Sequence, residues 1–260
     1  MFTLVSYEAD VAVGYAALTA IAPVPDPHVT IDGNSVIVPK ELNKLIGVSA
    51  TFVVDTVAAG LGKLAQLQSP GLRRVFNHDV THMSDGLDVI NPKHPQMFPD
   101  VPVPLDPDEG LQAWQSCAAL VNNNCQIGVW LSDGPIAKAT GEVRTIRFTS
   151  TTPSAQGVWT HGTLGVVQEL PQGDYAVVGA RVVSALDTGL FRLLFTGYDW
   201  RPGGILSRGV LEKDMDIFRR GNLGIWGTFN WRQLPRIEVN SVLASPVADP
   251  AVYLDLIKIT

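Results

Sequence analysis

Most of the second half of the chain alternates apolar and polar residues, or runs apolar for up to 12 residues. Turn sequences such as SDGP, PQGD, LDTG and RPGG separate these segments. Short segments of this kind with turns between them are typical of β-strands in a sandwich or barrel. The pattern therefore predicts an all-β fold here, with strands over 143–151, 163–170, 174–185, 190–197, 223–231, 236–244 and 252–259.

The first half shows the same signals less evenly. Residues 28–39 read as a hairpin around Asp-Gly-Asn, and strands are predicted over 49–57, 64–69, 110–118 and 126–132. Helix signals are confined to one or two turns in 39–47 and a short helix in 212–221 that ends at Gly221. The pattern disappears over 76–107, which is rich in Pro, Asp and His and predicts a long ordered loop.

Two stretches, 110–134 and 234–260, share the order strand, loop of small residues, strand. If the later stretch closes one domain, the earlier one can close a similar domain near Asp133. This reading predicts two tandem jelly-roll β-sandwiches, 1–135 with the long loop 76–107, and 136–260, each of the size that eight strands need. The alternative is one large irregular β-sandwich with a decorated N-terminal region.

The composition favours assembly. Hydrophobic residues make up 46% of the chain and charged residues 17%, against a typical value of about 25%, and mean hydropathy is +0.16. A surface so poor in charge indicates contact with other protein.

No stretch suits a transmembrane segment, and the first basic side chain is Lys40, so no signal peptide is expected. Cys117 and Cys125 are expected as reduced thiols, with a disulfide across their loop as the alternative.

The charge is unevenly divided. Net charge is −6, which argues against direct binding of nucleic acid. Residues 1–135 contain 6 Lys and Arg against 14 Asp and Glu, whereas residues 136–260 contain 13 against 11. Every arginine except Arg73 and Arg74 lies in the second half. Unlike halves on neighbouring copies would therefore attract one another.

Residues 76–94 carry the strongest signal for a metal. His78 and His82 are four residues apart and Asp85 is close, but two histidines at this spacing converge on a metal only on a helix, which Asp, Gly and Pro disfavour here. They remain weak candidates for a metal-dependent hydrolase that uses the 78–94 loop, and LDPDEG at 105–110 is an equally weak Ca²⁺ candidate.

Nucleophile and phosphate-loop motifs are absent from the sequence. We expect no enzymatic activity and no cofactor.

The six tryptophans all lie between 114 and 231. Aromatic side chains on a β-sandwich can stack on sugar rings, so a carbohydrate-binding module is the main alternative to a shell protein. Trp130 and Trp226 lie within apolar strands and are expected in the core. Trp200, in the turn YDWRPGG, is expected to reach a partner.

Five segments give the chain a resemblance to known proteins: LPQGDYAVVGARVVSA, DWRPGG, GNLGIWGTF, LPRIEV and VYLDLIKI. Over residues 110–260 the chain resembles the double jelly-roll major capsid proteins of tailless icosahedral viruses, the phage-type and adenovirus-hexon-like lineage. The resemblance rests on pattern and implies a virion shell protein, made in the host cytoplasm, whose partners are itself and other virion proteins.

In that family three chains form a pseudo-hexagonal capsomer, so the resemblance also implies a homotrimer that builds a larger shell. Alternation of acidic and basic halves around such a ring selects Arg219, Arg220, Asp108 and Glu109 as residues expected at contacts between copies. Trp200 joins them because of its place in a turn.

Overall fold

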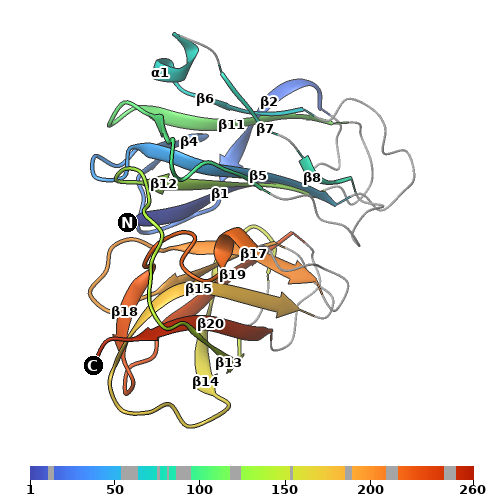
Figure 1. The fold of residues 1–260 in the computed structure, drawn as a ribbon. Helices are drawn as coiled ribbons and strands as arrows, with labels where there is room; N and C mark the ends of the chain where they lie inside the picture. The colour runs from blue at the N-terminus through green and yellow to red at the C-terminus, as the bar shows by residue number, and fades with distance from the viewer. Residues whose placement is uncertain are drawn as a thin grey trace. The chain divides into compact units, whose positions relative to one another are not determined.

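The chain is almost entirely β-structure in a computed structural model, which confirms the predicted all-β class (Figure 1). The structure describes all residues except 11–14, 54–63, 75–76, 81, 86–94, 118–123, 153–154, 185–188, 209–215 and 243–249. Two compact units are present. We call Val5–Gly134 the N-terminal jelly roll, and Met1–Leu4 with Pro135–Thr260 the C-terminal jelly roll.

The C-terminal jelly roll has the strand pairing that defines this fold. With eight strands lettered B to I along the chain, a jelly roll pairs them as B-I-D-G in one sheet and C-H-E-F in the other. Here β13-β20-β15-β18 form the first order and β14-β19-β16-β17 the second. Parallel pairing of β15 with β17 closes seven of the strands into a barrel. The strands are β13 (Arg144–Ser150), β14 (Thr160–Val166), β15 (Asp174–Ser184), β16 (Gly189–Leu194), β17 (Gly203–Arg208), β18 (Gly227–Asn230), β19 (Arg236–Ser241) and β20 (Ala251–Lys258).

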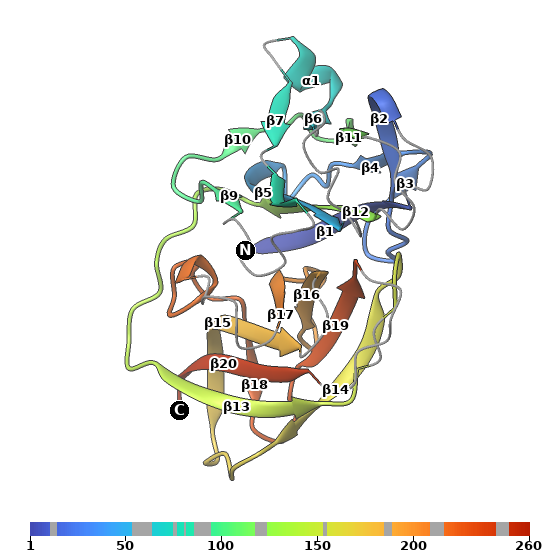
Figure 2. The same cartoon turned by 90° about the vertical axis from the view of Figure 1, so that its right-hand side faces the viewer.

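The N-terminal jelly roll repeats these pairings (Figure 2). The B-I-D-G order is β1-β12-β5 followed by the two short strands β9 and β10, and the C-H-E-F order is β2-β11-β6-β7. Strand β8 runs parallel to β5, just as β17 runs parallel to β15. The strands are β1 (Phe2–Asp10), β2 (Tyr15–Pro23), β5 (Lys44–Val53), β6 (Leu64–Gln68), β7 (His78–Val80), β8 (His82–Asp85), β9 (Gln96–Met97), β10 (Val103–Pro104), β11 (Gly110–Cys117) and β12 (Asn124–Ser132).

The two stretches that share a sequence pattern occupy the same places in the two units. Strands β11 and β12 are H and I of the N-terminal jelly roll, and β19 and β20 are H and I of the C-terminal one. The predicted hairpin over 28–39 is confirmed as β3 (Ile31–Asp32) and β4 (Ser35–Ile37), with Gly33 at φ 55° in the turn. This hairpin is an insertion between strands C and D.

Two local predictions are wrong. The segment 76–107 contains β7, β8, β9 and β10, which supply strands F and G, and is therefore not one irregular loop. These strands are two to four residues long, too short for a periodic pattern, and they form because β5 and β6 offer backbone partners. The segment 39–47 forms no helix, because β5 begins at Lys44 and is completed by pairing with β12.

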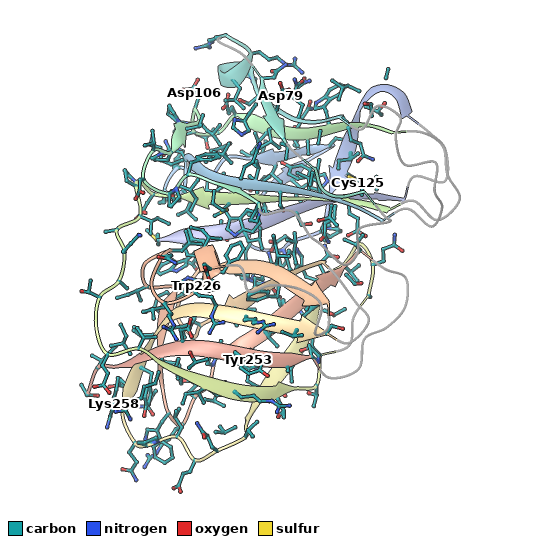
Figure 3. The ribbon with its side chains drawn as sticks, turned by 45° about the vertical axis from the view of Figure 1, so that its right-hand side comes forward. Asp79, Asp106, Cys125, Trp226, Tyr253 and Lys258 are labelled. Atoms are coloured by element: carbon teal, nitrogen blue, oxygen red, sulfur yellow. The ribbon has the colours of Figure 1, made fainter. Side chains whose placement is uncertain are left out.

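Each unit has its own core. In the N-terminal jelly roll Tyr7 is fully buried on strand B and donates its hydroxyl to the Leu111 carbonyl of strand H at 2.6 Å. Burial raises the pKa of Tyr7. Trp130 is buried here, and Trp226 (labelled in Figure 3) is buried in the C-terminal jelly roll, which confirms both as core residues. The ring of Trp226 lies edge-on to Phe2 at 5.4 Å and stacks near Phe191.

Part of the outer B-I-D-G face of the C-terminal jelly roll is covered by its own chain. A short 3-10 helix, η2 (Asp216–Phe218), is followed by Gly221, whose carbonyl accepts from Ala139 N at 2.9 Å and whose N–H donates to Val178 O. Gly221 has φ 82°, and the close approach of Ala139 leaves no room for a side chain. The predicted short helix that ends at Gly221 thus corresponds to η2 among the described residues.

Candidate functional site

The histidines of the predicted metal loop lie on strand F. The His78 side chain on β7 is half-buried, and its ring lies 5.5 Å from that of Phe98. Burial lowers the pKa of His78, and the Asp79 charge opposes this shift. His82 and Asp85 lie on β8, with side chains outside the described set. Within the described residues no three His, Cys, Asp or Glu side chains gather as a metal site would require.

The acidic residues predicted at the interface have local roles. Glu109 accepts hydrogen bonds from Ser69 Oγ at 2.8 Å and Gly71 N at 2.7 Å, at the start of the short helix α1 (Pro70–Arg73). It also accepts from Asp106 N at 3.1 Å, so its carboxylate holds a turn of its own jelly roll. Asp108 is exposed at φ 64° and lies 3.4 Å from Lys40 Nζ. Of the two, Asp108 is the one that presents its charge to solvent.

Arg219 is used inside its own unit. Its Nε and Nη2 donate to Asp255 at 2.8 and 2.9 Å, and Arg220 N donates to the same carboxylate at 2.8 Å. Asp255 is fully buried on strand I and also accepts from Thr145 Oγ1. Burial alone would raise the pKa of Asp255, but the bonds from Arg219, Thr145 and the Arg220 N–H hold it below its usual value. The Arg220 side chain is exposed.

The tryptophan expected at a contact is half-buried. Trp200 donates Nε1 to the Trp226 carbonyl at 3.3 Å and lies edge-on to Tyr198 at 4.4 Å. All six tryptophans belong to the described residues, and none of them is classed as exposed. The described surface therefore offers no exposed row of indole rings for sugar stacking. Of the cysteines, Cys125 is buried on β12, and the side chain of Cys117 lies outside the described set.

A row of ionisable side chains crosses three strands of the C-terminal jelly roll, with Arg192 and Glu238 buried and His161 exposed. Glu238 on β19 lies directly opposite Arg192 on β16 and His161 on β14. Its carboxylate contacts Arg192 Nε, lies 2.5 Å from Arg201 Nη1 and lies 2.9 Å from His161 Nδ1. Arg192 and Glu238 are fully buried, and the Arg192 guanidinium lies 4.0 Å from the centroid of the Trp159 ring. Low dielectric strengthens these charge-assisted bonds.

Two arginines of this network, Arg192 and Arg201, also bind the backbone of Leu4 near the start of the chain. Arg192 Nη1 donates to the Leu4 carbonyl at 3.4 Å, and Leu4 N donates to the Arg201 carbonyl at 3.0 Å. Sequence reasoning missed this network. The signal was present, because LFRLLF and IEV each place one charge between apolar residues, and a charge that remains in a buried strand needs a partner.

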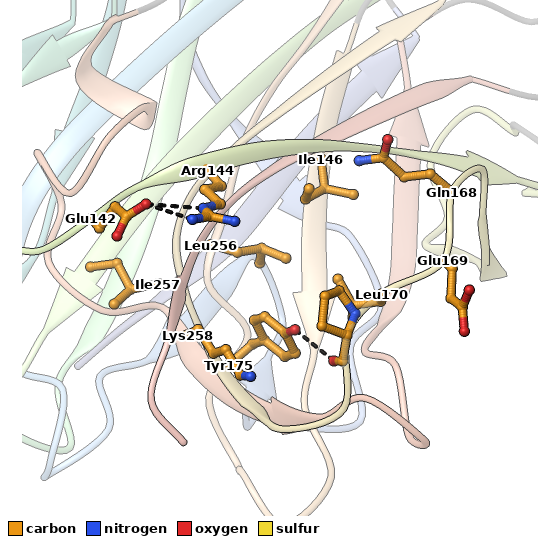
Figure 4. A pocket seen from close by; sticks show the side chains of 11 residues that line it. Glu142, Arg144, Ile146, Gln168, Glu169, Leu170, Tyr175, Leu256, Ile257 and Lys258 are labelled. Carbon is orange, nitrogen blue, oxygen red and sulfur yellow. Dashed lines mark hydrogen bonds and ion pairs between the residues drawn. The ribbon is translucent and has the colours of Figure 1, made fainter.

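The pocket drawn in Figure 4 has a volume of about 480 Å³ and lies at one end of the C-terminal jelly roll. Four of its lining residues are aliphatic, and Arg144 is held by Glu142 at 2.7 Å. The Tyr175 hydroxyl donates to the Pro171 carbonyl at 2.6 Å. No Ser, Thr, Cys or His lines it, so it cannot form a Ser–His or Cys–His nucleophile pair. Its lining is Glu142, Arg144, Ile146, Gln168, Glu169, Leu170, Pro171, Tyr175, Leu256, Ile257 and Lys258.

A second pocket, of about 410 Å³, is also lined mainly by polar side chains. These groups already bind one another, since Asn230 donates to Asp174 at 2.7 Å and Gln233 donates to Thr196 at 2.9 Å. A sugar would have to displace these bonds to be recognised.

Comparisons with protein-family models, curated proteins and solved structures found no match to this chain. No helix among the described residues is long and apolar enough to span a membrane. Function must therefore be argued from the strand topology, the charge distribution and the described surfaces.

Proposed function

We propose that the chain is a structural protein of a virion shell, made in the host cytoplasm, that assembles with itself as trimers and with other virion proteins into the shell. The observation that carries the proposal is the repeat of one eight-strand jelly-roll pairing in two consecutive units. Three such chains contribute six similar blocks, from which a pseudo-hexagonal capsomer can be built.

Several features support a structural role over a catalytic one. The larger described pocket holds no Ser–His or Cys–His pair, and the described residues hold no cluster suited to a metal. The low share of charged residues suits a surface that is covered in an assembly. In a closed shell many modest interfaces add up, so no single contact has to be strong.

The proposed assembly can be tested by measuring the mass of the chain in solution and the shape of the particles that it forms. Purified chain at micromolar concentration should sediment as a trimer and, at higher concentration, form closed shells or sheets with hexagonal units in negative-stain electron microscopy. Assembly should weaken with salt if charge guides the contacts. A monomer at all concentrations that binds glycans, or hydrolyses ester or glycoside substrates, would favour the carbohydrate-binding or hydrolase alternative.

The structure refines which charged residues can be used in such a test. Changing Arg219 to Glu would break its pair with buried Asp255 and so disturb the jelly roll itself. Arg220→Glu changes an exposed side chain and leaves the backbone donor to Asp255 in place. We expect the Arg220 variant to report on contacts between copies, and the Arg219 variant to report mainly on folding.

A further inference from the structure

The pocket of about 480 Å³ lies on the inner face of the B-I-D-G sheet, at the end of the C-terminal jelly roll where β13 begins and β20 ends. Arg144 lies directly opposite Leu256, and Lys258 lies directly opposite Tyr175. Side chains two residues apart on a strand share a face, so Lys258 lies on the same face as buried Leu256. Two cationic side chains therefore flank a leucine at the inner face of the sheet.

The segment 168–171 forms another wall of the pocket and is held in place by the fold. The Tyr175 hydroxyl donates to the Pro171 carbonyl at 2.6 Å, and the Tyr175 ring stacks near Phe229 at 5.6 Å. Leu170 is buried, so this wall is anchored at two successive residues. The pocket is therefore formed before any ligand binds, which lowers the entropic cost of binding.

Aliphatic side chains supply an apolar contact surface inside the pocket. Ile146, Leu170 and Leu256 come from β13, the 168–171 segment and β20, and all three line the pocket (Figure 4). Its volume lies within the range of about 300 to 1,000 Å³ that is usual for small-molecule sites. An alkyl chain that enters the pocket would leave water for apolar contacts, which drives binding.

The charges around the pocket favour an anionic head group. Lys258 is exposed and forms no ion pair with any residue that the structure describes. Its Cε lies 2.7 Å from the position that a Cβ at Gly173 would take, so this glycine makes room for the lysine side chain beside the pocket. A carboxylate that enters here would find an ammonium group with its donors free for it.

The other charged residues of the lining do not oppose this assignment. Arg144 donates from Nε and Nη2 to a single oxygen of Glu142, at 3.1 and 2.7 Å, so Glu142 is occupied and Nη1 of Arg144 can still donate. Glu169 is exposed, and Figure 4 shows its carboxylate pointing away from Leu256. The donors of Arg144 and Lys258 are thus directed at the pocket without a carboxylate between them.

We propose that this pocket binds a medium-chain fatty acid. The alkyl chain packs against Ile146, Leu170 and Leu256, and the carboxylate accepts hydrogen bonds from Lys258 and Arg144. The site goes beyond the proposed shell function and does not depend on it, because all of its residues belong to one jelly roll.

The first experiment tests whether the pocket recognises the head group. Equilibrium dialysis of the full chain is carried out with octanoate, octan-1-ol and octylammonium, which share one alkyl chain. We expect octanoate to bind at one site per chain and about tenfold more tightly than octan-1-ol, because the carboxylate accepts charge-assisted hydrogen bonds. Octylammonium should bind most weakly. Equal affinity for octanoate and octan-1-ol, tighter binding of octylammonium, or no binding of octanoate at all would each overturn the inference.

The second experiment tests the position of the alkyl chain. From hexanoate to octanoate to decanoate, affinity should rise about threefold for each added methylene that is buried. In NMR spectra of methyl-labelled protein, octanoate should shift the methyl signals of Ile146, Leu170 and Leu256. An affinity that does not depend on chain length, or shifts confined to methyl groups outside the pocket, would contradict the proposed site.

Two variants separate the head group from the chain. Lys258→Gln should weaken octanoate binding about tenfold and leave octan-1-ol binding unchanged, because only the charged donor is lost. Lys138→Gln is the matched control, since Lys138 is an exposed lysine of the same jelly roll that does not line the pocket. Ile146→Trp should fill the pocket and abolish the binding of both ligands. Thermal unfolding shows whether a variant is folded, and the two lysine variants decide the question if Ile146→Trp is not.

The outcomes also separate this site from the proposed function. If Lys258→Gln binds octanoate as tightly as Lys138→Gln does, the fatty-acid site is wrong whether or not the chain assembles. If the parent chain stays a monomer but shows the expected order of affinities, the site stands and the shell function fails.

Discussion

The two jelly rolls share their strand pairing but differ in the chemistry of strands C, H and E. In the N-terminal unit these strands, β2, β11 and β6, contain no charged residue. In the C-terminal unit the same three places hold His161, Glu238 and Arg192 in one row, in which Glu238 and Arg192 are buried and His161 is exposed. One topology thus accommodates an uncharged sheet and a sheet with an internal ion network. The alternation of apolar positions suffices for the topology, and the charges are an addition to it.

Strands F and G differ as well. In the C-terminal unit they are single strands, β17 and β18, of 6 and 4 residues. In the N-terminal unit the same places are taken by the pairs β7 with β8 and β9 with β10, each strand 2 to 4 residues long. Fewer backbone hydrogen bonds hold these pieces, so we expect this part of the N-terminal unit to open more readily in hydrogen exchange than its counterpart.

The largest effect is expected from the ion network. Glu238→Gln leaves Arg192 and Arg201 buried without a carboxylate, which should lower the free energy of unfolding by about 3 to 5 kcal/mol. The loss should be confined to the C-terminal jelly roll in denaturant titration followed by hydrogen exchange. Glu169→Gln, at an exposed site, is the control. An equal loss in both variants would contradict a network specific to Glu238.

A smaller loss is expected at the anchor of the η2 segment. Asp255→Asn weakens the charge-assisted bonds from Arg219 and Thr145 and should cost about 2 kcal/mol at neutral pH. Because the folded pKa of Asp255 is lowered, its stabilisation is present above the unfolded pKa of about 3.9 and is lost as pH falls through the folded pKa. Unfolding measured from pH 6 downward should therefore show a weaker pH dependence below pH 4 in the variant than in the parent chain. An equal pH dependence of stability in the variant and the parent chain would exclude the Asp255–Arg219 pair as a source of acid sensitivity.

Two glycines on strand D test whether the units tolerate the same change. A Cβ at Gly179 would lie 2.8 Å from Arg220 N, Phe218 O and the Asp255 carboxylate, none of which can move easily. A Cβ at Gly47 would meet the end of the flexible Met97 side chain. Gly179→Ala should therefore cost roughly 1.5 kcal/mol by overpacking, and Gly47→Ala clearly less. Thermal unfolding of both variants measures this, and equal costs would contradict the packing difference.

The smallest effect concerns His78. Because burial lowers its folded pKa, neutral His78 stabilises the fold above the unfolded pKa of about 6.5, and this contribution is lost as pH falls through the folded pKa. His78→Gln should remove that part of the pH dependence and change stability little at pH 8. Titration of the imidazole by NMR would give a direct value, and a pKa above 6.5 would contradict the prediction.

The sequence by itself determined the β class, the 28–39 hairpin, most long strands and two core tryptophans. These depend on period-two alternation, turn residues and apolar runs, which are local in the chain. It also pointed to a repeat, because strands H and I of both units are long enough to show their pattern. The division of charge between the two halves is likewise readable from composition alone.

Tertiary structure alone decided the short F and G strands, the start of β5 and the roles of individual charged residues. Arg219, Glu109 and Arg147 look alike in sequence as exposed charges. Only the fold brings Arg219 to buried Asp255 and Glu109 to the start of α1, while Arg147 is left facing outward. The reason is physical. A strand of two residues forms only where a distant strand offers hydrogen bonds, and the role of a single charge depends on partners distant in sequence. The local sequence pattern does not specify these partners.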